Sequence, residues 1–319
     1  MLTRGTLSYL GQRLAFLAFT AIAVSSLVFL GVHQLPGNAF LSDRRIDPNA
    51  LAALLHHYHL DLPLLEQYRL FVIGILHGDL GESLVNRGVK ITPLLLREAT
   101  VSAEVGAAAL VVTIGLGMVL GVVAAVRHNT VVDYVATTTA VVGFSMPNFV
   151  IASLLVVVFA VWLYNTTGGA FYYELGWHGT HGNLSQIPVP AFALGFPYAS
   201  IVARLTRASM LDVIGQDYVR TARAKGLPER IVIMRHALRN ALIPVVSVLG
   251  PLVVGIITGS VVIENIFGIP GLGKEFVTSI LNRDYNIVIG VFTVYAVLIG
   301  LANLLVDMLY TAIDPRIHY

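Results

Sequence analysis

The segment Asp217–Pro244, DYVRTARAKGLPERIVIMRHALRNALIP, is a basic, polar stretch between two long apolar runs of the chain. Gly226 lies where a first helix would end in a left-handed C′ residue. Pro228 then suits the first turn of a second helix, and Glu229 is favourable near the positive end of that helix. We therefore predict a short helix, a hinge and a second, amphipathic helix, held at a membrane surface.

The second helix of this segment carries a predicted apolar stripe. The stripe follows the spacing i, i+3, i+7 and i+11 of one helical face and consists of Ile231, Met234, Leu238 and Leu242, beside Arg235 and Arg239. Eight Lys or Arg residues fall between Arg204 and Arg239, against three acidic residues. The alternative interpretation is an ordinary basic loop that does no more than set the orientation of the chain.

The composition is that of a membrane protein. Of the 319 residues, 56% are hydrophobic and 12% are charged, which is far more apolar than a soluble globular protein. The net charge of +2 gives no electrostatic support for a nucleic-acid partner. Cysteine is absent, which excludes disulfides, thiolate metal sites and cysteine nucleophiles. No H-E-x-x-H or G-x-S-x-G motif occurs, so we assign no catalytic residue.

Six apolar runs are long enough to cross about 30 Å of hydrocarbon. They are Leu14–Val32, Val105–Val126, Tyr134–Tyr164, Ile187–Ala203, Ala241–Ile263 and Ile287–Val306. The fourth is shorter and is interrupted by Pro188, Pro190 and Pro197. Five spans, with the proline-rich run re-entrant, is therefore the alternative to six.

The distribution of Lys and Arg predicts the orientation. The connection 165–186 has none, whereas 204–239 has eight and the turn 127–133 has Arg127. Both termini also carry Arg. We therefore expect the termini, this turn and the loop 204–240 to face the cytoplasm. The connection 33–104 holds six Lys or Arg, but connections of that length are translocated largely regardless of charge.

Residues 34–104 are predicted to be a small extracytoplasmic insertion with helices over Asn49–Tyr58 and Leu64–Leu76 and a glycine-rich turn at 78–83. His56, His57 and His59 cluster around the end of the first helix, and His178 and His181 lie in the other outer connection. Histidine is a good nickel or zinc ligand. Because 56 and 57 point to different faces of a helix and no close carboxylate completes a set, we favour surface or packing histidines and assign no metal site.

The third run is interrupted near its middle by Ser145-Met146-Pro147-Asn148-Phe149. Proline frees a backbone carbonyl, and such breaks are tolerated in lipid where neighbours or water satisfy the freed groups. Ser145, Pro147, Asn148 and Phe149 are candidates for lining a pathway, and a purely structural kink is the alternative. Glu264, at the outer end of the fifth run, either meets a substrate at the pathway mouth or ends the helix at the interface.

Two glycine features indicate packing and turns. Gly117-x-x-x-Gly121 and Gly255-x-x-x-Gly259 can let helix backbones approach closely. Residues 268–274 fit the first seven positions of a phosphate-binding loop, but Glu275 replaces the Ser or Thr that would hold magnesium. A glycine turn that feeds a short amphipathic helix, Phe276–Leu281, is the better interpretation.

The segment 217–244 resembles the EAA loop of the membrane subunits of binding-protein-dependent ABC importers. The Glu-Ala-Ala positions read Arg220-Thr221-Ala222, so only Ala222 matches, and the Gly and Pro of the family pattern follow at Gly226 and Pro244. The sequence ARAKGL…RHALRNALIP is most similar to the dipeptide/oligopeptide/nickel branch of this family. The Pro36-Gly37 stop, the 78–83 turn, the Ser-x-Pro-x-Phe break, the 268–273 turn and the end at 303–316 resemble that branch in the same order.

The resemblance implies an all-α integral membrane protein with six transmembrane helices in the type I ABC importer permease fold. Its parts would be the first helix (1–33), the insertion (34–104) and a transmembrane core (105–319) with the coupling loop 204–240. Such a chain forms half of the pathway of an ATP-driven oligopeptide or dipeptide importer in the bacterial inner or plasma membrane and is not itself an enzyme. The implied coupling residues are Asp217, Arg220, Thr221, Ala222, Arg223, Ala224, Lys225, Gly226, Pro228 and Glu229.

The implied partners are a second, homologous permease, two cytoplasmic ABC ATPase subunits, an extracytoplasmic solute-binding protein and membrane lipid. ATP and magnesium would bind to the ATPase subunits, so no cofactor is expected on this chain. Two other functions stay open: a nickel or metal-chelate importer of the same architecture, and a channel or secondary transporter that works alone. The sequence does not identify the substrate, and it leaves open how the loop is anchored with Arg220 in place of the usual Glu.

Overall fold

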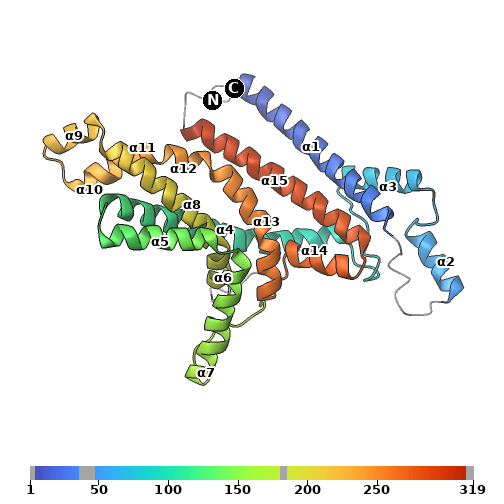
Figure 1. Cartoon of the computed structure of the whole chain (residues 1–319). Coiled ribbons are helices and arrows are strands. Elements are labelled where there is room, and N and C mark those ends of the chain that lie inside the picture. The colour runs from blue at the N-terminus through green and yellow to red at the C-terminus, as the bar shows by residue number, and fades with distance from the viewer. Residues whose placement is uncertain (1–3, 36–46, 180–184, 314–319) are drawn as a thin grey trace. The chain divides into compact units, whose positions relative to one another are not determined.

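The computed structural model describes residues 4–35, 47–179 and 185–313, and these residues form helices without a named strand (Figure 1). A single bridge pairs Glu82 with Lys90. The predicted Pro36-Gly37 stop, His181 and the tail from Asp314 lie outside the described residues. The described chain contains six helices that are long and apolar enough to cross a membrane, which confirms the predicted count of six.

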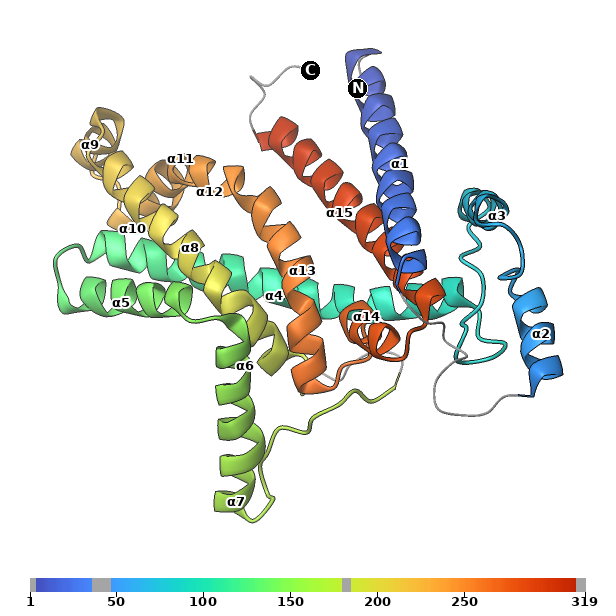
Figure 2. The same ribbon diagram turned by 45° about the vertical axis from the view of Figure 1, so that its right-hand side comes forward.

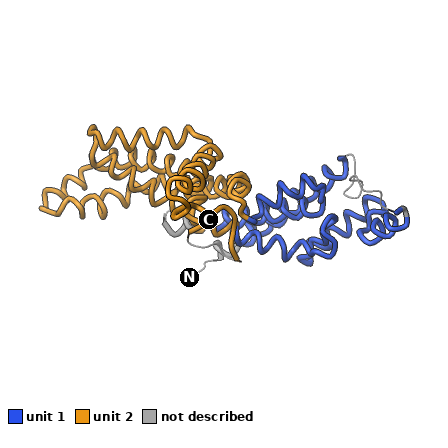
Figure 3. The backbone as a smooth tube through the Cα atoms, turned by 90° about the horizontal axis from the view of Figure 1, so that it is seen from below, with its two compact units in different colours: residues 1–101, 270–305, 316–319 blue, residues 102–269, 306–315 orange. Residues whose placement is uncertain are grey.

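The chain divides into two compact units (Figure 3). The first comprises residues 1–101, 270–305 and 316–319, and so groups the first helix and the insertion with a late segment of the chain. Its helices are α1 (Arg4–His33), α2 (Pro48–His57), α3 (Leu64–Leu76), the beginning of α4 (Ile91–Val126), α14 (Leu272–Leu281) and most of α15 (Tyr285–Ile313).

The core of the first unit is formed where α4 begins. Five fully buried side chains from α4, α14 and α15 pack there: Ile91, Leu95, Leu272, Ile287 and Val291. The helix α1 is joined to α15 by a buried hydrogen bond of 2.7 Å between the hydroxyls of Ser25 and Thr293. A hydrogen bond is directional, so this one fixes the position of α1 along α15, which apolar contacts alone would leave free.

The two insertion helices occur where the sequence predicts them. Asp47 caps α2 by accepting a 2.7 Å hydrogen bond from the amide of Asn49, and Pro48 occupies the first turn, where no amide hydrogen is needed. The helix α3 has the predicted bounds, and the turn that follows it uses positive φ at Gly78 and Gly81. Local signals therefore suffice to place these elements.

Asp284 connects the insertion to the last helix within this unit. Its buried carboxylate accepts hydrogen bonds from the Ser83 hydroxyl and from the amides of Leu84 and Val85, and it also accepts a 3.4 Å bond from the amide of Ile287 at the start of α15. One side chain thus caps a transmembrane helix and holds a loop from a point about 200 residues earlier in the chain.

The second unit comprises residues 102–269 and 306–315. After the end of α4 come α5 (Val131–Ser145), α6 (Asn148–Leu155), a π-helical stretch (Val156–Trp162) and α7 (Leu163–Thr167). They are followed by α8 (Pro188–Ile214), α9 (Asp217–Ala224), α10 (Glu229–Ile231), a second π-helical stretch (Val232–Ala237), α11 (Leu238–Ala241), α12 (Ile243–Ser247) and α13 (Leu249–Phe267).

The predicted close helix packing at glycine is confirmed between α4 and α8. A Cβ on Gly117 would lie 2.7 Å from the carbonyl oxygen of Ala199, and a Cβ on Gly121 would lie 2.7 Å from that of Ala203. No side chain fits in these spaces, so the two backbones are in direct contact along two turns. The second pair behaves alike, because a Cβ on Gly255 would meet the Tyr198 ring at 2.8 Å.

The bounds of two predicted spans were wrong. The second helix begins at Ile91 rather than Val105, because the charged residues near its start end an apolar window without ending a helix. The third candidate span is Asn148–Thr167 rather than Tyr134–Tyr164, and α5 is a separate apolar helix of 15 residues. The chain is extended at Met146 and Pro147, so the helix stops completely between α5 and α6.

The fourth and fifth spans also differ from the prediction. The helix α8 is continuous over Pro188–Ile214: Pro188 and Pro190 lie in its first turn, where amides have no helical partner, and Pro197 is accommodated inside. The fifth span is Leu249–Phe267, because short helices around Pro244 precede it instead of one helix from Ala241. Proline in a sequence therefore did not identify which helix breaks.

Candidate functional site: the loop after α8 and the helix break

The loop after α8 forms a helix–hinge–helix, as its sequence predicts. The helix α9 ends at Ala224, and Gly226 takes φ 75°, the left-handed conformation expected of a C′ residue. Its amide donates to the carbonyl of Arg223 at 2.9 Å. A Cβ on Gly226 would meet nothing within 4 Å, so the backbone conformation, and not lack of space, is the reason for glycine.

Of the ten predicted coupling residues, Ala222 alone is buried, at 5% exposure. It packs in one cluster with Val219 and Val232, which lie on either side of the hinge. Ala222, the one residue that matches the Glu-Ala-Ala pattern, therefore lies where the two helices of the loop pack together. The other nine, including Arg220, are exposed and available to a partner.

The predicted apolar stripe of the second helix was partly wrong. Ile231 and Met234 are 42% and 55% exposed, whereas Val232, Ile233 and Ala237 are buried with Leu238. The reason is the π-helical stretch Val232–Ala237, whose wider turn rotates the inward face relative to an α-helix. The exposed Ile231 and Met234 leave apolar surface on the loop.

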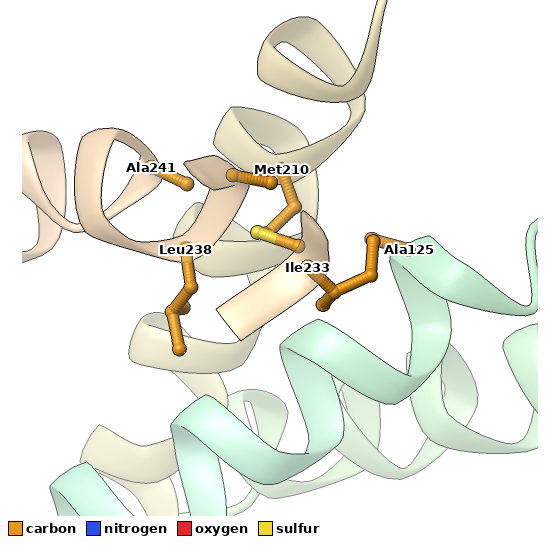
Figure 4. Close-up of a cluster of buried hydrophobic side chains, with 6 residues drawn as sticks. Ala125, Met210, Ile233, Leu238 and Ala241 are labelled. Carbon is orange, nitrogen blue, oxygen red and sulfur yellow. The ribbon is translucent and has the colours of Figure 1, made fainter. Parts of the chain in front are cut away.

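The buried face anchors the loop on two long helices. Figure 4 shows Met210 of α8 between Ile233 and the pair Leu238 and Ala241, with Ala125 of α4 beside them. The cluster also includes Ala237, and all members are at most 7% exposed. These close-packed side chains hold the loop against α4 and α8.

An ion pair spans the hinge. The Arg223 guanidinium donates to both carboxylate oxygens of Glu229, at 2.7 and 3.2 Å, across Gly226. The hydrogen bond from Arg223 holds the pKa of Glu229 below its usual range. Arg220 lies 3.6 Å from Asp217 with its side chain 71% exposed, so the residue in the usual Glu position points into solvent.

A second ion pair, which the sequence analysis did not predict, joins α5 to α8. Asp133 is 2% exposed and accepts from Arg207 Nε at 2.7 Å and Nη2 at 2.8 Å. Its other partners are the amide of Asn129 at 3.0 Å, the hydroxyl of Thr137 at 3.2 Å and Nδ1 of His128 at 3.2 Å. The Arg207 hydrogen bonds hold the pKa of Asp133 well below its usual range. A buried acid in the first turn of an apolar helix is the signal that could have suggested a partner.

The helix break brings one of its four candidate residues beside α13. Figure 2 shows α6 leaving the direction of α5 at this point. Asn148 is the first residue of α6, and its side-chain nitrogen Nδ2 lies 3.3 Å from where a Cβ on Gly259 of α13 would be. Ser145, Pro147 and Phe149 are exposed in the chain. Their role in lining a pathway stays a prediction.

Glu264 lies inside α13 rather than at its end, and it is fully buried. The hydroxyl of Ser102 donates to it at 2.7 Å. The predicted glycine turn follows α13, with Gly268 at φ 72°, but the helix after it, α14, begins at Leu272 rather than at the predicted Phe276. A role of Glu264 at a pathway mouth stays a prediction.

The histidines of the insertion are dispersed. His57 lies 3.4 Å from Glu82, both at the surface, whereas His59 lines a cavity. Among the described residues no group of three His, Cys, Asp or Glu has the arrangement of a metal site.

Comparison with known proteins gives consistent matches. Residues 117–319 match the family described as binding-protein-dependent transport system inner membrane component. The chain is 41% identical to the oligopeptide transport system permease protein OppB of Escherichia coli K12, over 94% of this chain and 95% of that protein. It is also 41% identical to the dipeptide transport system permease protein DppB of Bacillus subtilis, over 97% of each.

Among solved structures, the chain is similar to a chain of the crystal structure of an amino acid ABC transporter with histidines. The TM-score is 0.50 at 16% identity, with 68% of this chain and 93% of that chain covered. At this identity the likeness is one of fold.

Proposed function

This chain belongs to the binding-protein-dependent transport system inner membrane components, and on that premise we propose that it forms half of the pathway of an ATP-driven oligopeptide or dipeptide importer. Its fold is the type I importer permease fold, built from six apolar helices. The observation that carries the substrate class is the likeness to peptide permeases along almost the whole chain, 41% over 94% in one and over 97% in another.

The proposal includes the partners and the orientation. A second, similar permease completes the pathway, two ATPase subunits bind on the cytoplasmic side, and a solute-binding protein delivers peptide from outside. ATP and magnesium belong to the ATPase subunits. In a bacterial inner membrane, both termini and the loop 204–240 face the cytoplasm, because Lys and Arg concentrate there.

Orientation is tested by cysteine labelling, which the absence of native cysteine makes direct. Ala170 and Lys225 are both exposed, one in the outer connection and one in the loop. In intact spheroplasts a membrane-impermeant maleimide should label Ala170→Cys and should reach Lys225→Cys only after lysis. The reverse pattern would overturn the orientation.

The loop is proposed to dock in a groove of an ATPase subunit through its exposed surface. Its charged residues surround the apolar side chains of Ile231 and Met234, a combination that suits a specific and reversible contact. The Arg223–Glu229 pair and the Ala222 contact keep the hairpin rigid, and the buried cluster around Met210 passes its movement to α4 and α8. Alternation between outward- and inward-facing states follows from such rigid-body motion.

The hinge is tested at Gly226. Valine at φ 75° is strained by about 1–2 kcal/mol, although space is open, whereas asparagine tolerates this conformation. Gly226→Val should lose transport-coupled ATPase activity, and Gly226→Asn should retain most of it. Wild-type coupling in the valine variant would refute the hinge.

The function is tested by isolating the tagged chain from native membranes, identifying its partners and measuring ATP hydrolysis and uptake. We expect two P-loop subunits, a second permease and vanadate-sensitive hydrolysis that peptide-loaded binding protein stimulates. Nickel uptake without peptide uptake would instead favour the metal importer, and an active lone chain without ATPase would favour a channel or secondary transporter.

A further inference from the structure

A cavity of about 230 Å³ lies within the first unit, and no role assigned above uses it. Its walls come from the end of α1, the α2–α3 connection, α3, the turn at 79–81 and the start of α15. Liquid water occupies about 30 Å³ per molecule. The cavity is therefore too small for a drug-sized ligand but fits one molecule or group of the size of an amino-acid side chain.

One part of the cavity wall is aromatic and apolar. The rings of Phe29 and Phe71 stack at 5.2 Å, and Leu70 and Ile289 add aliphatic surface. Tyr58 also lines the cavity. Because its hydroxyl already donates to the carbonyl of Ser83 at 3.0 Å, Tyr58 contributes its ring to the wall. This part of the wall suits an apolar body.

The side-chain amides of the cavity lining donate to backbone carbonyls. The side-chain nitrogen of Gln67 donates to the carbonyl of Leu62 at 2.8 Å, and that of Asn286 donates to the carbonyl of Glu82 at 3.0 Å. In the α1 helix, Nδ1 of His33 is 2.8 Å from the carbonyl of Phe29, which can only accept, so Nδ1 carries the hydrogen.

Acceptors, in contrast, converge on the cavity. In neutral His33, Nε2 is then an acceptor, and it lies 3.2 Å from the side-chain oxygen of Gln67, a second acceptor. Solvent reaches both groups, and an N–H group placed against both would take the place of water there. The cavity also has a negative charge: Asp79 is the single carboxylate in its lining, which contains no Lys or Arg.

The position of Asp79 is built into the fold. Its amide donates to the carbonyl of Gly74 at 2.9 Å, and its Oδ1 accepts from the amide of Gly81 at 2.9 Å. A Cβ on Gly74 would lie 2.7 Å from the Asp79 carbonyl oxygen, so glycine is needed for this approach. The backbone of the turn thus fixes the position of Asp79, an exposed residue in the cavity lining.

We propose that this cavity binds a primary ammonium group carried on a small apolar body. The ammonium donates to Asp79 and to the facing acceptors of His33 and Gln67, and the body packs on Phe29 and Phe71. An ammonium beside aromatic faces and a carboxylate gains both charge pairing and cation–π attraction. The inference goes beyond the proposed function, because it concerns binding by this chain alone and requires no transport.

The test measures binding of phenethylamine to the purified chain in lipid nanodiscs by calorimetry at pH 8, above the range in which histidine side chains ordinarily titrate. N-acetylphenethylamine has the same ring and spacer without the charge. Asp79→Asn keeps an oxygen to accept from Gly81, so the turn is retained. Asp61→Asn, an acid outside the cavity lining, is the matched control.

Phenethylamine should bind the wild type, and affinity should fall by at least about tenfold on acetylation of the ligand or in Asp79→Asn, with no change in Asp61→Asn. Absence of binding to the wild type, equal affinity for the acetylated ligand, or wild-type affinity in Asp79→Asn would each overturn the proposal. Comparison of phosphatidylethanolamine with phosphatidylglycerol nanodiscs identifies the source of the ammonium. Weaker binding in the former means that lipid headgroups occupy the site, and equal binding means that it takes a soluble amine.

Discussion

Loss of the Asp133 carboxylate should destabilise the second unit strongly. Its side chain is 3% exposed, it accepts two hydrogen bonds from Arg207, and it also binds the Asn129 amide and the Thr137 hydroxyl. Removal of one partner from a buried ion pair costs about 3–5 kcal/mol, because the other charge is left without compensation. Since the Arg207 side chain is 27% exposed and water can reach it, we expect the lower end, about 3 kcal/mol, for Asp133→Ala.

The assay is reversible unfolding by SDS titration in mixed micelles, applied to Asp133→Ala, Arg207→Met and the double variant. About 3 kcal/mol corresponds to a change of roughly a hundredfold in the unfolding equilibrium. The single losses should not add, because the double variant leaves no unpaired charge, and the cycle should give a coupling of at least about 1.5 kcal/mol.

The pair Glu66 and Arg69 is the matched control. It joins the same two charge types at 3.4 Å, but the side chains are 49% and 69% exposed. Exposed pairs contribute about 0–1 kcal/mol, so Glu66→Ala should change stability by less than about 0.5 kcal/mol. If Asp133→Ala lowers the free energy of unfolding by less than about 1 kcal/mol, or if the losses in the cycle are additive, burial does not make this ion pair more stabilising than an exposed one, and the reasoning is refuted.

Three further outcomes are expected. Gly121→Val should destabilise the fold by about 3 kcal/mol or prevent folding, because the Cβ of the new side chain would lie 2.7 Å from a backbone carbonyl oxygen. Gly115→Ala on the same helix is the control: its Cβ would meet nothing within 4 Å, so it should be neutral or slightly stabilising in the same titration. The Arg223 hydrogen bond lowers the pKa of Glu229 in the folded chain, so the stabilisation by the ionised Glu229 is complete above the ordinary value of 4.5 and is lost as pH falls through the lowered value. The difference in stability between the wild type and Glu229→Gln should therefore vanish on acidification. A difference that stays constant with pH would contradict this. Asp284→Ala removes the cap of α15 and leaves the 83–85 amides without their acceptor, and hydrogen exchange should rise in both places together rather than in one.

Local sequence signals predicted the elements that depend on neighbouring residues. The hinge at Gly226 has the expected left-handed φ, since a C′ position favours glycine whatever surrounds it. The helix Leu64–Leu76 was predicted to the residue. The glycine pair in α4 correctly indicated close packing, although its partner helix could not be known.

Prediction failed where neighbours in space override local preference. Proline breaks the chain completely at 147 but not at 197, because whether the freed carbonyl is satisfied depends on what packs beside it. The inward face of the second loop helix rotated, because packing on Met210 is combined with a π-helical stretch that no periodicity of the sequence announces.

The sequence by itself determined the membrane class, the count of six apolar helices and the hinge, since hydrophobic length and glycine conformation are properties of a residue and its near neighbours. The tertiary structure alone decided which side chains the buried carboxylates meet. Asp133 meets Arg207 across 74 residues and Asp284 meets Ser83 across 201, and the cavity beside Asp79 exists because five segments converge on it. Burial makes these contacts strong, and burial is a property of the assembled fold.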